Sequence, residues 1–449
     1  MVVLCRMKKI TLILGLLLFA GLANSQSIAK NADQLLKAYY DNDQFTGSVM
    51  LVKNGEVVYK GHYGFADRDK RKLNNAGTEY RIGSISKPMT SIIILKLVDQ
   101  KKIHLQDKMA KYLPGLSKYD SVTIEHLLQH QSGIKSITST KVYNTDRKSI
   151  IGKNEVIAIL SKEEKQFSPG TQWQYSNSNY MLLSYIAEKV SGKSMEQLIK
   201  EMAVAMGMKH TGMDHDGRKS NNKAMGYEAV LFDDYVPIED NNIQLTSGAG
   251  SVYSTLDDLY QFHQSLQSNP GISDALMQKM YTPGKKGYGY GWEVGEYKGE
   301  KEVGHSGSIE GFKSMIMRYP GNNSCIIFLS NYWNTPGQEI CDKLRNILFD
   351  EAFTMPSKLT YVDPGSGKLK SYEGAYRFND AITMHIEANE KGLISAIEGQ
   401  PPVAFRALGD DAFWNRSHQS TMQFDLDETG KVKGFILKKG KQQMEWKKQ

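Results

Sequence analysis

A serine and a lysine three residues apart, Ser84 and Lys87, are the residues of this sequence best suited to nucleophilic chemistry. Pro88 follows them, and because proline is tolerated only in the first turn of a helix, a helix is expected to start at or just before Ser84. Residues three apart share a helix face, so the hydroxyl and the amine would point the same way. A buried, unprotonated amine can take the hydroxyl proton. The pair is therefore a candidate activated nucleophile.

The same spacing also arises often by chance. Its plainer interpretation is a serine that caps a helix, followed by a solvated lysine. Taken alone, the plainer interpretation is the better one, so the hypothesis of a nucleophile depends on what the rest of the chain supplies.

Two regions rich in predicted strands enclose a helical middle in this chain of 449 residues. After a short helix over residues 33–40, Asn54-Gly55 between two β-branched runs predicts a hairpin over residues 47–60. Strand character returns over residues 288–294, 312–319 and 325–330, before a helix over residues 337–353. We expect one antiparallel sheet built from both ends of this region, with a helical lobe above it and a cleft between them.

Short alternating runs separated by turn signals follow residue 356 and predict a small all-β domain, a barrel or curled sheet, over residues 366–449. Asp363-Pro364-Gly365 marks the linker, which leaves a larger domain over residues 26–355. The expected fold class is therefore α+β, an antiparallel sheet flanked by helices with a helical lobe, plus the C-terminal all-β domain.

The N-terminus has the pattern of an export signal. Lys8 and Lys9 precede an apolar run too short to span a bilayer comfortably, and the small residues Ala23 and Ser25 follow it. This predicts a signal peptide over residues 1–25 and a periplasmic or secreted protein of bacterial type, with no stable membrane span after cleavage. A retained N-terminal anchor is the alternative.

The net charge and the cysteine content narrow the possible class of protein further. Three of the formal +7 charges, Arg6, Lys8 and Lys9, lie in the predicted signal, and the remaining +4 is too mild to indicate nucleic-acid binding. Cys325 opens an apolar run, so a buried free thiol is favoured over a disulfide with Cys341. An exported chain with so few cysteines must depend on its hydrophobic core.

Two histidines four residues apart, His126 and His130, suggest the spacing of a zinc site. Leu127 takes the place of the glutamate in a His-Glu-x-x-His motif, and no third ligand is evident, so packing or loop bracing is the better interpretation. We expect neither a metal nor another cofactor.

Further motifs along the chain favour the interpretation of Ser84 and Lys87 as an activated nucleophile. They are Ser84-Ile85-Ser86-Lys87, the segment over residues 127–133, Pro169-Gly170-Thr171 with Tyr175-Ser176-Asn177, the glycine loop near Gly248, and Gly304-His305-Ser306-Gly307-Ser308. With these motifs and the hairpin, residues 35–350 resemble the serine hydrolases of the penicillin-binding-protein and class C β-lactamase group, including their esterase and D-aminopeptidase relatives. Each motif is weak alone, but three catalytic motifs in the family's order are specific.

The resemblance implies a role for each matched residue. Ser84 would attack an acyl carbonyl while Lys87 and Tyr175 share its proton, with Tyr175 acting as base if the neighbouring ammonium lowers its pKa. Asn177 would hold Lys87 and the substrate amide. The backbone N–H groups of Ser84 and Ser308 would form the oxyanion hole, which stabilises the developing charge.

The strand-edge motif departs from the family pattern in a way that bears on the substrate. Gly307 would let the backbone approach closely, but His305 stands where many relatives have the lysine of Lys-Thr-Gly. A largely neutral histidine offers a weaker charge for a substrate carboxylate, which disfavours efficient β-lactam hydrolysis. Asn179, where many relatives have glycine, is expected to be a tolerated change at a helix start.

The expected protein is an exported serine hydrolase with an acyl-enzyme at Ser84. Its substrate would be a small molecule or peptide, with cell-wall compounds as candidates and an ester, amide or D-amino-acid peptide bond as the target. One alternative is a catalytically weak penicillin-binding or sensor-type protein of the same fold. Another is a peptidoglycan-binding or scaffold role led by the C-terminal domain.

Overall fold

The computed structural model describes residues 25–449 except for residues 151, 233–234, 240–241, 270 and 380. The predicted signal peptide, apart from Ser25, therefore lies outside the described residues. Within the described part of the chain, no helix is both long and apolar enough to cross a bilayer.

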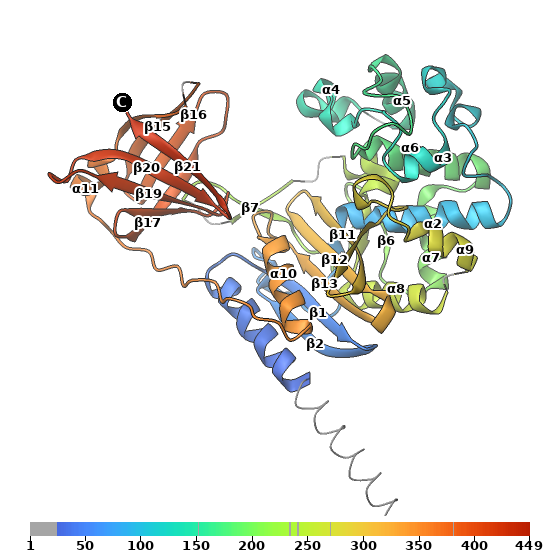
Figure 1. Ribbon diagram of the computed structural model, residues 1–449, viewed down its shortest axis with the longest axis horizontal. Coiled ribbons are helices and arrows are strands. Elements are labelled where there is room, and N and C mark those ends of the chain that lie inside the picture. Colours follow the sequence, from blue (N-terminus) through green and yellow to red (C-terminus); the bar gives the residue numbers. More distant parts are fainter. Residues whose placement is uncertain (1–24, 151, 233–234, 240–241, 270, 380) are drawn as a thin grey trace, which may run out of the picture.

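A six-stranded antiparallel sheet forms the centre of the larger domain, in the order β10-β11-β12-β13-β1-β2 (Figure 1). Its strands are β1 (Gly47–Lys53), β2 (Glu56–Tyr63), β10 (Glu293–Tyr297), β11 (Glu300–Ile309), β12 (Phe312–Tyr319) and β13 (Ser324–Ser330). The early hairpin joins the late strands through β1 and β13, where Val49 lies opposite Phe328. The prediction of one sheet built from both ends of this region is confirmed.

One predicted strand begins later than expected. Strand character was expected from residue 288, but β10 starts at Glu293 because residues 288–292 form a loop. Gly291 in this loop has φ +81°, and a Cβ there would lie only 3.0 Å from the carbonyl oxygen of Lys87. The loop therefore bends to pass close to the first turn of the Ser84 helix.

Helices cover both faces of the sheet, and alternate residues of β1 show it. Met50 and Val52 belong to the core shared with the helical lobe, whereas Val49 and Leu51 pack against a helix over residues 25–41 and against α10 (Gly337–Leu348). The helices of the lobe are α2 (Ser86–Asp99), α3 (Ile124–Leu128), α4 (Lys141–Thr145), α5 (Lys153–Lys162), α6 (Asn177–Ser191), α7 (Met195–Ala205), α8 (Leu256–Ser268) and α9 (Asp274–Met280).

Short strand pairs connect the lobe to the sheet. They are β3 (Phe65–Asp67) with β4 (Lys72–Leu73), β7 (Tyr227–Ala229) with β8 (Tyr235–Pro237), and β5 (Tyr80–Arg81), β9 (Val252–Ser254) and β6 (Gly212–Met213) in a small sheet. The strand β5 leads directly into the Ser84 segment, so this small sheet fixes where that segment begins.

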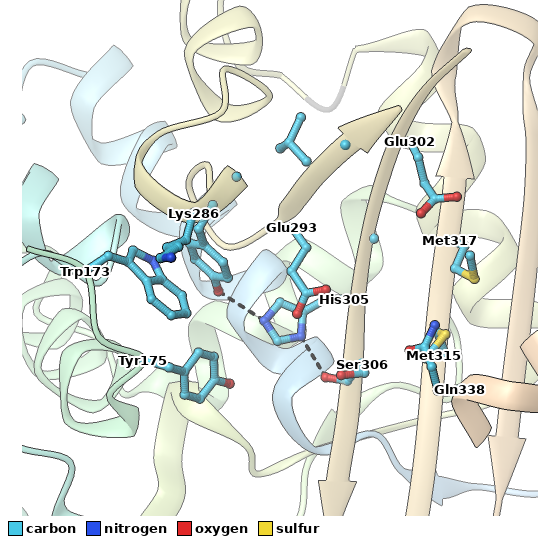
Figure 2. A pocket seen from close by; sticks show the side chains of 15 residues that line it. Trp173, Tyr175, Lys286, Glu293, Glu302, His305, Ser306, Met315, Met317 and Gln338 are labelled. Atoms are coloured by element: carbon cyan, nitrogen blue, oxygen red, sulfur yellow. Dashed lines mark hydrogen bonds between the residues drawn. The ribbon is translucent and has the colours of Figure 1, made fainter. Parts of the chain in front are cut away.

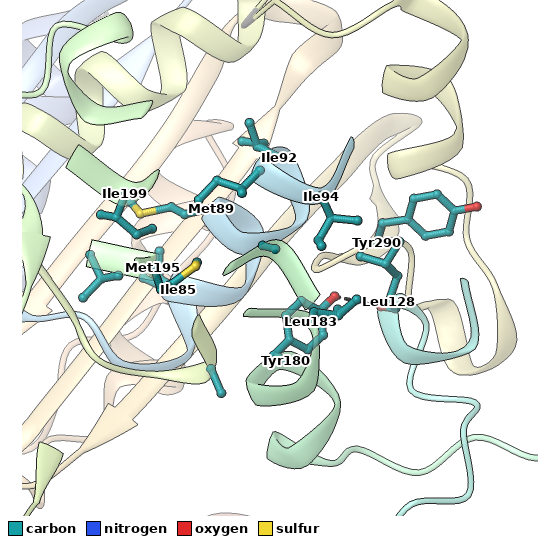
Figure 3. Close-up of a cluster of buried hydrophobic side chains, with 14 of the residues drawn as sticks. Ile85, Met89, Ile92, Ile94, Leu128, Tyr180, Leu183, Met195, Ile199 and Tyr290 are labelled. Atoms are coloured by element: carbon teal, nitrogen blue, oxygen red, sulfur yellow. Dashed lines mark hydrogen bonds between the residues drawn. The ribbon is translucent and has the colours of Figure 1, made fainter. Parts of the chain in front are cut away.

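The helix α2 runs through the middle of the lobe and is buried along almost its whole length (Figure 3). Met89 and Ile92 belong to the same hydrophobic core as Leu183 of α6 and Ile199 of α7. A helix surrounded by close-packed side chains has little freedom to move. It therefore holds its first turn, with Ser84 and Lys87, in a fixed position.

The C-terminal domain is a closed antiparallel barrel, as the alternating pattern predicted. Its strands are β14 (Gly374–Phe378), β15 (Ile382–Asn389), β16 (Gly392–Ile397), β17 (Val403–Gly409), β18 (Ala412–Asn415), β19 (Ser420–Leu426), β20 (Val432–Lys439) and β21 (Gln442–Lys448). Residues 351–365 connect the two domains without regular secondary structure, and α11 (Ser366–Ser371) precedes the barrel. Tyr376, Phe424 and Phe435 are among the aromatic residues that fill its core.

Candidate active site

Ser84 lies in a 3₁₀ turn (η1, Gly83–Ile85) at the start of α2, and Lys87 lies in the helix's first turn. Lys87 Nζ is 2.8 Å from Ser84 Oγ. It also donates to Asn177 Oδ1 at 2.9 Å and to the carbonyl oxygen of Ala249 at 2.8 Å. The amine is fully buried, and this burial lowers the pKa of Lys87 well below its usual value. The structure thus brings three of the predicted residues and one unpredicted carbonyl together.

The surroundings of Lys87 suit a neutral amine. Asn177 Oδ1 and the Ala249 carbonyl oxygen can only accept hydrogen bonds, so they take both N–H groups of a neutral amine. The lone pair of the nitrogen then faces Ser84 Oγ. In this state Lys87 can remove the hydroxyl proton of Ser84.

Tyr175 contacts the same hydroxyl from another direction, and its O–H donates to Ser84 Oγ at 2.9 Å. Burial raises the pKa of Tyr175 above its usual value, and the bond to Ser84 only partly offsets this. The condition for Tyr175 to act as the base, a lowered phenol pKa, is not met, because the amine beside it is itself driven towards the neutral form. Tyr175 is suited to give a proton.

Asn177, the first residue of α6, is held from both sides. Its Nδ2 donates to Thr138 Oγ1 at 3.2 Å, and its backbone N–H donates to Ser136 Oγ at 3.1 Å. The amide orientation follows from the Thr138 contact, which leaves the oxygen for Lys87. The segment over residues 136–138, which the sequence did not mark, therefore orients Asn177.

His130 and Asn179 brace the loop beneath the site. The backbone N–H of Ser176 donates to His130 Nδ1 at 3.2 Å, and Ser132 Oγ donates to Asn179 Oδ1 at 2.6 Å. His126 instead accepts from the backbone N–H of Thr123 in a helix-capping pair. The interpretation of the two histidines as structural is confirmed, and Asn179 has a buried bonding role as well as a place in the first turn of α6.

The strand β11 runs tightly along the Ser84 turn. A Cβ on Gly307 would lie 2.1 Å from the carbonyl oxygen of Ile82, and a Cβ on Gly83, which has φ +50°, would lie 3.0 Å from the backbone nitrogen of Ser308. Ser314 Oγ of β12 donates to the same Ile82 oxygen at 2.8 Å. The backbone nitrogen of Ser308 thus lies beside η1, as an oxyanion hole shared with the Ser84 N–H requires.

His305 is buried, and both ring nitrogens are engaged (Figure 2). Its Nδ1–H donates to the carbonyl oxygen of Ser306 at 2.7 Å, and its Nε2 accepts from the Tyr288 hydroxyl at 3.0 Å. Burial and the nearby Lys87 lower the pKa of His305 to about 3. The imidazole is neutral at physiological pH and supplies no positive charge to the site.

A cavity of about 310 Å³ lies beside Tyr175 and His305 (Figure 2). Its walls include Trp173, Glu293 and Glu302, none of which the sequence marked as functional. Trp173 stands two residues before Tyr175 and could have been noticed there. A single glutamate on a strand carries no spacing signal, so nothing in the sequence pointed to Glu293.

Comparison with known proteins agrees with this geometry. A profile described as Beta-lactamase matches residues 32–348. The chain is 28% identical over 444 residues to Penicillin-binding protein 4* of Bacillus subtilis (strain 168), covering 92% of this chain and 97% of that protein. It is 30% identical over 309 residues to the putative penicillin-binding protein PbpX of the same strain, covering 67% of this chain and 74% of that protein.

Solved structures share the fold. The octameric penicillin-binding protein homologue from Pyrococcus abyssi superposes with a TM-score of 0.63 at 24% identity, over 91% of this chain and 97% of that one. A class C beta-lactamase gives a TM-score of 0.61 at 21% identity, over 73% of this chain and 97% of that one. The chain therefore belongs to the beta-lactamase family, whose fold serine hydrolases and penicillin-binding proteins share.

Proposed function

We propose that the protein is an exported serine hydrolase that cleaves an ester, amide or D-amino-acid peptide bond through an acyl-enzyme on Ser84. One observation carries this proposal. The Ser84 hydroxyl contacts a lysine amine driven towards its neutral form at 2.8 Å and a tyrosine phenol kept protonated at 2.9 Å. A nucleophile between a proton acceptor and a proton donor is what acyl transfer needs.

The reaction follows from these roles. Lys87 removes the Ser84 proton as Oγ forms a bond to the acyl carbon, and the backbone N–H groups of Ser84 and Ser308 stabilise the oxyanion. The bond to the leaving group then breaks as Tyr175 protonates the leaving atom, and the proton held by Lys87 replaces the one that Tyr175 gave. Water attacks the acyl-enzyme, which releases the acid and restores the Ser84 hydroxyl.

The neutral state of His305 supports the choice of substrate class. A β-lactam or a peptide with a free C-terminal carboxylate needs a positive partner at this strand edge, and His305 offers none. The export signal pattern at the N-terminus and the relatives named as penicillin-binding proteins support a place outside the cytoplasm.

A panel of p-nitrophenyl esters, D-amino-acid amides and a chromogenic cephalosporin tests the proposal. We expect turnover of an ester or amide by the wild type, little turnover of the cephalosporin, and none of either by Ser84→Ala. Ser161→Ala, which removes a hydroxyl on α5 away from the site, is the matched control. Equal turnover by Ser84→Ala and wild type would refute the proposal.

The names of the relatives favour one second candidate, a penicillin-binding or sensor-type protein that is acylated but releases the acyl group slowly. Such a protein would accumulate a stable adduct on Ser84 in intact-mass spectra without steady turnover. A hydrolase shows an adduct that disappears once the substrate is consumed.

A further inference from the structure

The cavity beside Tyr175 lies next to the group proposed to protonate the leaving atom. Tyr175 donates to Ser84 Oγ and also lines the cavity, together with His305 and Ser306 of β11. A group that protonates the leaving atom must lie within hydrogen-bond reach of it. We therefore expect the remainder of the leaving group to extend past Tyr175 into this space.

The acidic side chains of the cavity differ in how they are neutralised. Glu302 Oε2 accepts from the Tyr319 hydroxyl at 2.7 Å and lies 3.3 Å from Arg345 Nη1. The Glu293 carboxylate makes no ion pair or hydrogen bond with any residue in the described part of the chain. It is therefore the uncompensated negative charge of the cavity.

The surroundings of Glu293 also disfavour its charged form. Glu293 lines the cavity from an exposed position of β10. Partial burial and the negative charge of Glu302 raise the pKa of Glu293, and the Glu293 charge in turn helps to raise the pKa of Tyr175. Lys286 is the basic side chain of the lining, and it is exposed at the rim on the Trp173 side of the cavity (Figure 2). Among the described residues that line the cavity there is no other lysine or arginine, so Glu293 has no cationic partner there.

The cavity that Glu293 lines also has an aromatic wall, of which Trp173 and Tyr175 are labelled in Figure 2. This wall consists of Trp173, Tyr175 and Tyr288, and the rings of Trp173 and Tyr288 lie 6.1 Å apart between centroids. Aromatic faces attract ammonium groups, and the attraction grows when water is excluded. A carboxylate and aromatic rings that line one cavity are a suitable arrangement for an organic cation.

We propose that this cavity binds a cationic leaving group, with Glu293 as its counter-charge and Trp173 as its aromatic contact. The inference rests on the proposed function and narrows its substrates to esters or amides of an alcohol or amine that carries an ammonium. A leaving group with a carboxylate would instead meet Glu293 and gain no charge from His305.

Three thioesters that share one acyl group and differ only in the thiol test this proposal. The thiols are thiocholine, its neutral carbon isostere 3,3-dimethylbutanethiol, and thioglycolate, and a disulfide dye reports their release. The acyl group is the one best accepted in the ester and amide panel. For the wild type we expect kcat/KM to be roughly tenfold higher for the thiocholine ester than for the neutral isostere, with the thioglycolate ester slowest.

Two variants that each remove one negative charge show whether the selectivity for the thiocholine ester depends on Glu293. Glu293→Gln should lower the ratio of thiocholine to neutral thioester several-fold, and the preference that remains is the contribution of the aromatic wall. Glu296→Gln removes the same charge from an exposed position of β10 outside the cavity lining and should keep the wild-type ratio. Equal loss of selectivity in both variants would show a general charge effect and overturn the proposal.

The outcomes separate this proposal from the function on which it rests. Turnover of the neutral thioester without preference for the thiocholine ester would leave the serine hydrolase intact and refute the cationic subsite. Absence of turnover for every ester, amide and thioester, with no acylation of Ser84 in intact-mass spectra, would refute both.

Discussion

Burial decides which of the two groups around Ser84 takes the proton. Both Lys87 and Tyr175 are shielded from water, and shielding disfavours the charged form of each. For a lysine this means a free lone pair, and for a tyrosine it means a retained O–H. The same physical cause therefore favours Lys87 as the base and Tyr175 as the acid of the proposed reaction.

We expect Lys87→Ala to lower kcat/KM for an accepted ester by roughly 10²- to 10⁴-fold, because the variant lacks the proton acceptor. Residues of one catalytic unit are not additive. The double variant Ser84→Ala with Lys87→Ala should therefore be no slower than Ser84→Ala alone. Steady-state turnover measures this, and a loss equal to the product of the single losses would contradict the shared role.

The buried amine should also make stability depend on pH. The unfolded chain titrates its lysines near a pKa of about 10.4, whereas the folded-state pKa of Lys87 is lowered. Its stabilising contribution is complete above the unfolded value and is lost as the pH falls towards the folded value, by about 1.4 kcal/mol for each pH unit in that window.

Lys87→Met should remove this dependence. Its free energy of unfolding relative to wild type should rise as the pH is lowered from about 10 to about 7, measured by urea denaturation at each pH. A difference that stays constant over this range would show that Lys87 is protonated in the folded protein.

Site residues that belong to side-chain motifs could be predicted from the sequence, whereas site contacts made by backbone atoms could not. Ser84, Lys87, Tyr175 and Asn177 carry characteristic spacings, and the structure brings them together. The Ala249 carbonyl acts through the backbone, where any residue type would serve. Its contribution is visible only once the chain is folded.

The strand β11 and the turn η1 form the element pair on which the proposed oxyanion hole depends. Their contact leaves no room for a side chain at Gly307, whose Cβ would lie 2.1 Å from the Ile82 carbonyl oxygen. Any added atom must push β11 away from η1 and carry the Ser308 N–H with it.

We expect Gly307→Ala to slow acylation of Ser84 by roughly 10²- to 10³-fold, the usual effect of losing one oxyanion donor. Gly367→Ala in α11 is the control, because a Cβ there meets no atom within 4 Å and the residue lies outside the cavity lining. The rate of labelling by a fluorophosphonate measures acylation, with circular dichroism to verify folding. Equal rates for the two folded variants would contradict the proposed placement of the hole.

Elements with strong patterns were predicted more accurately than those with polar sequences. The hairpin around Asn54-Gly55 and the strand β12 were expected where they occur. The last barrel strand, β21, was not expected, because its polar sequence shows little apolar alternation. Its pairing with β14 and β20 supplies the stability that its own residues do not indicate.

At the scale of the whole molecule, the barrel contacts the larger domain through a loop over residues 416–419 and through Arg406, which donates to the Phe232 carbonyl oxygen at 2.6 Å. Asn334 Nδ2 donates to the Ser417 carbonyl oxygen at 2.6 Å, and Ser417 Oγ donates to the Ala229 carbonyl oxygen at 2.9 Å. Arg416 pairs with Asp43 at 3.2 Å. The barrel residues in these contacts belong neither to the Ser84 hydrogen-bond network nor to the cavity lining.

A chain that ends before residue 360 should therefore still turn over an accepted ester, although its melting temperature should fall because the docking surface is uncovered. Activity and circular dichroism of the shortened chain measure the two effects. A folded but inactive shortened chain would indicate that the C-terminal domain contributes to the site, in favour of a function led by that domain.

Intact-mass spectrometry of the protein quenched during turnover of an accepted ester tests the acyl-enzyme most directly. We predict a mass increase equal to the acyl group, located on Ser84 by peptide mapping, which disappears when the substrate is exhausted and is absent from Ser84→Ala. An adduct on another residue, or the same adduct in Ser84→Ala, would contradict the account.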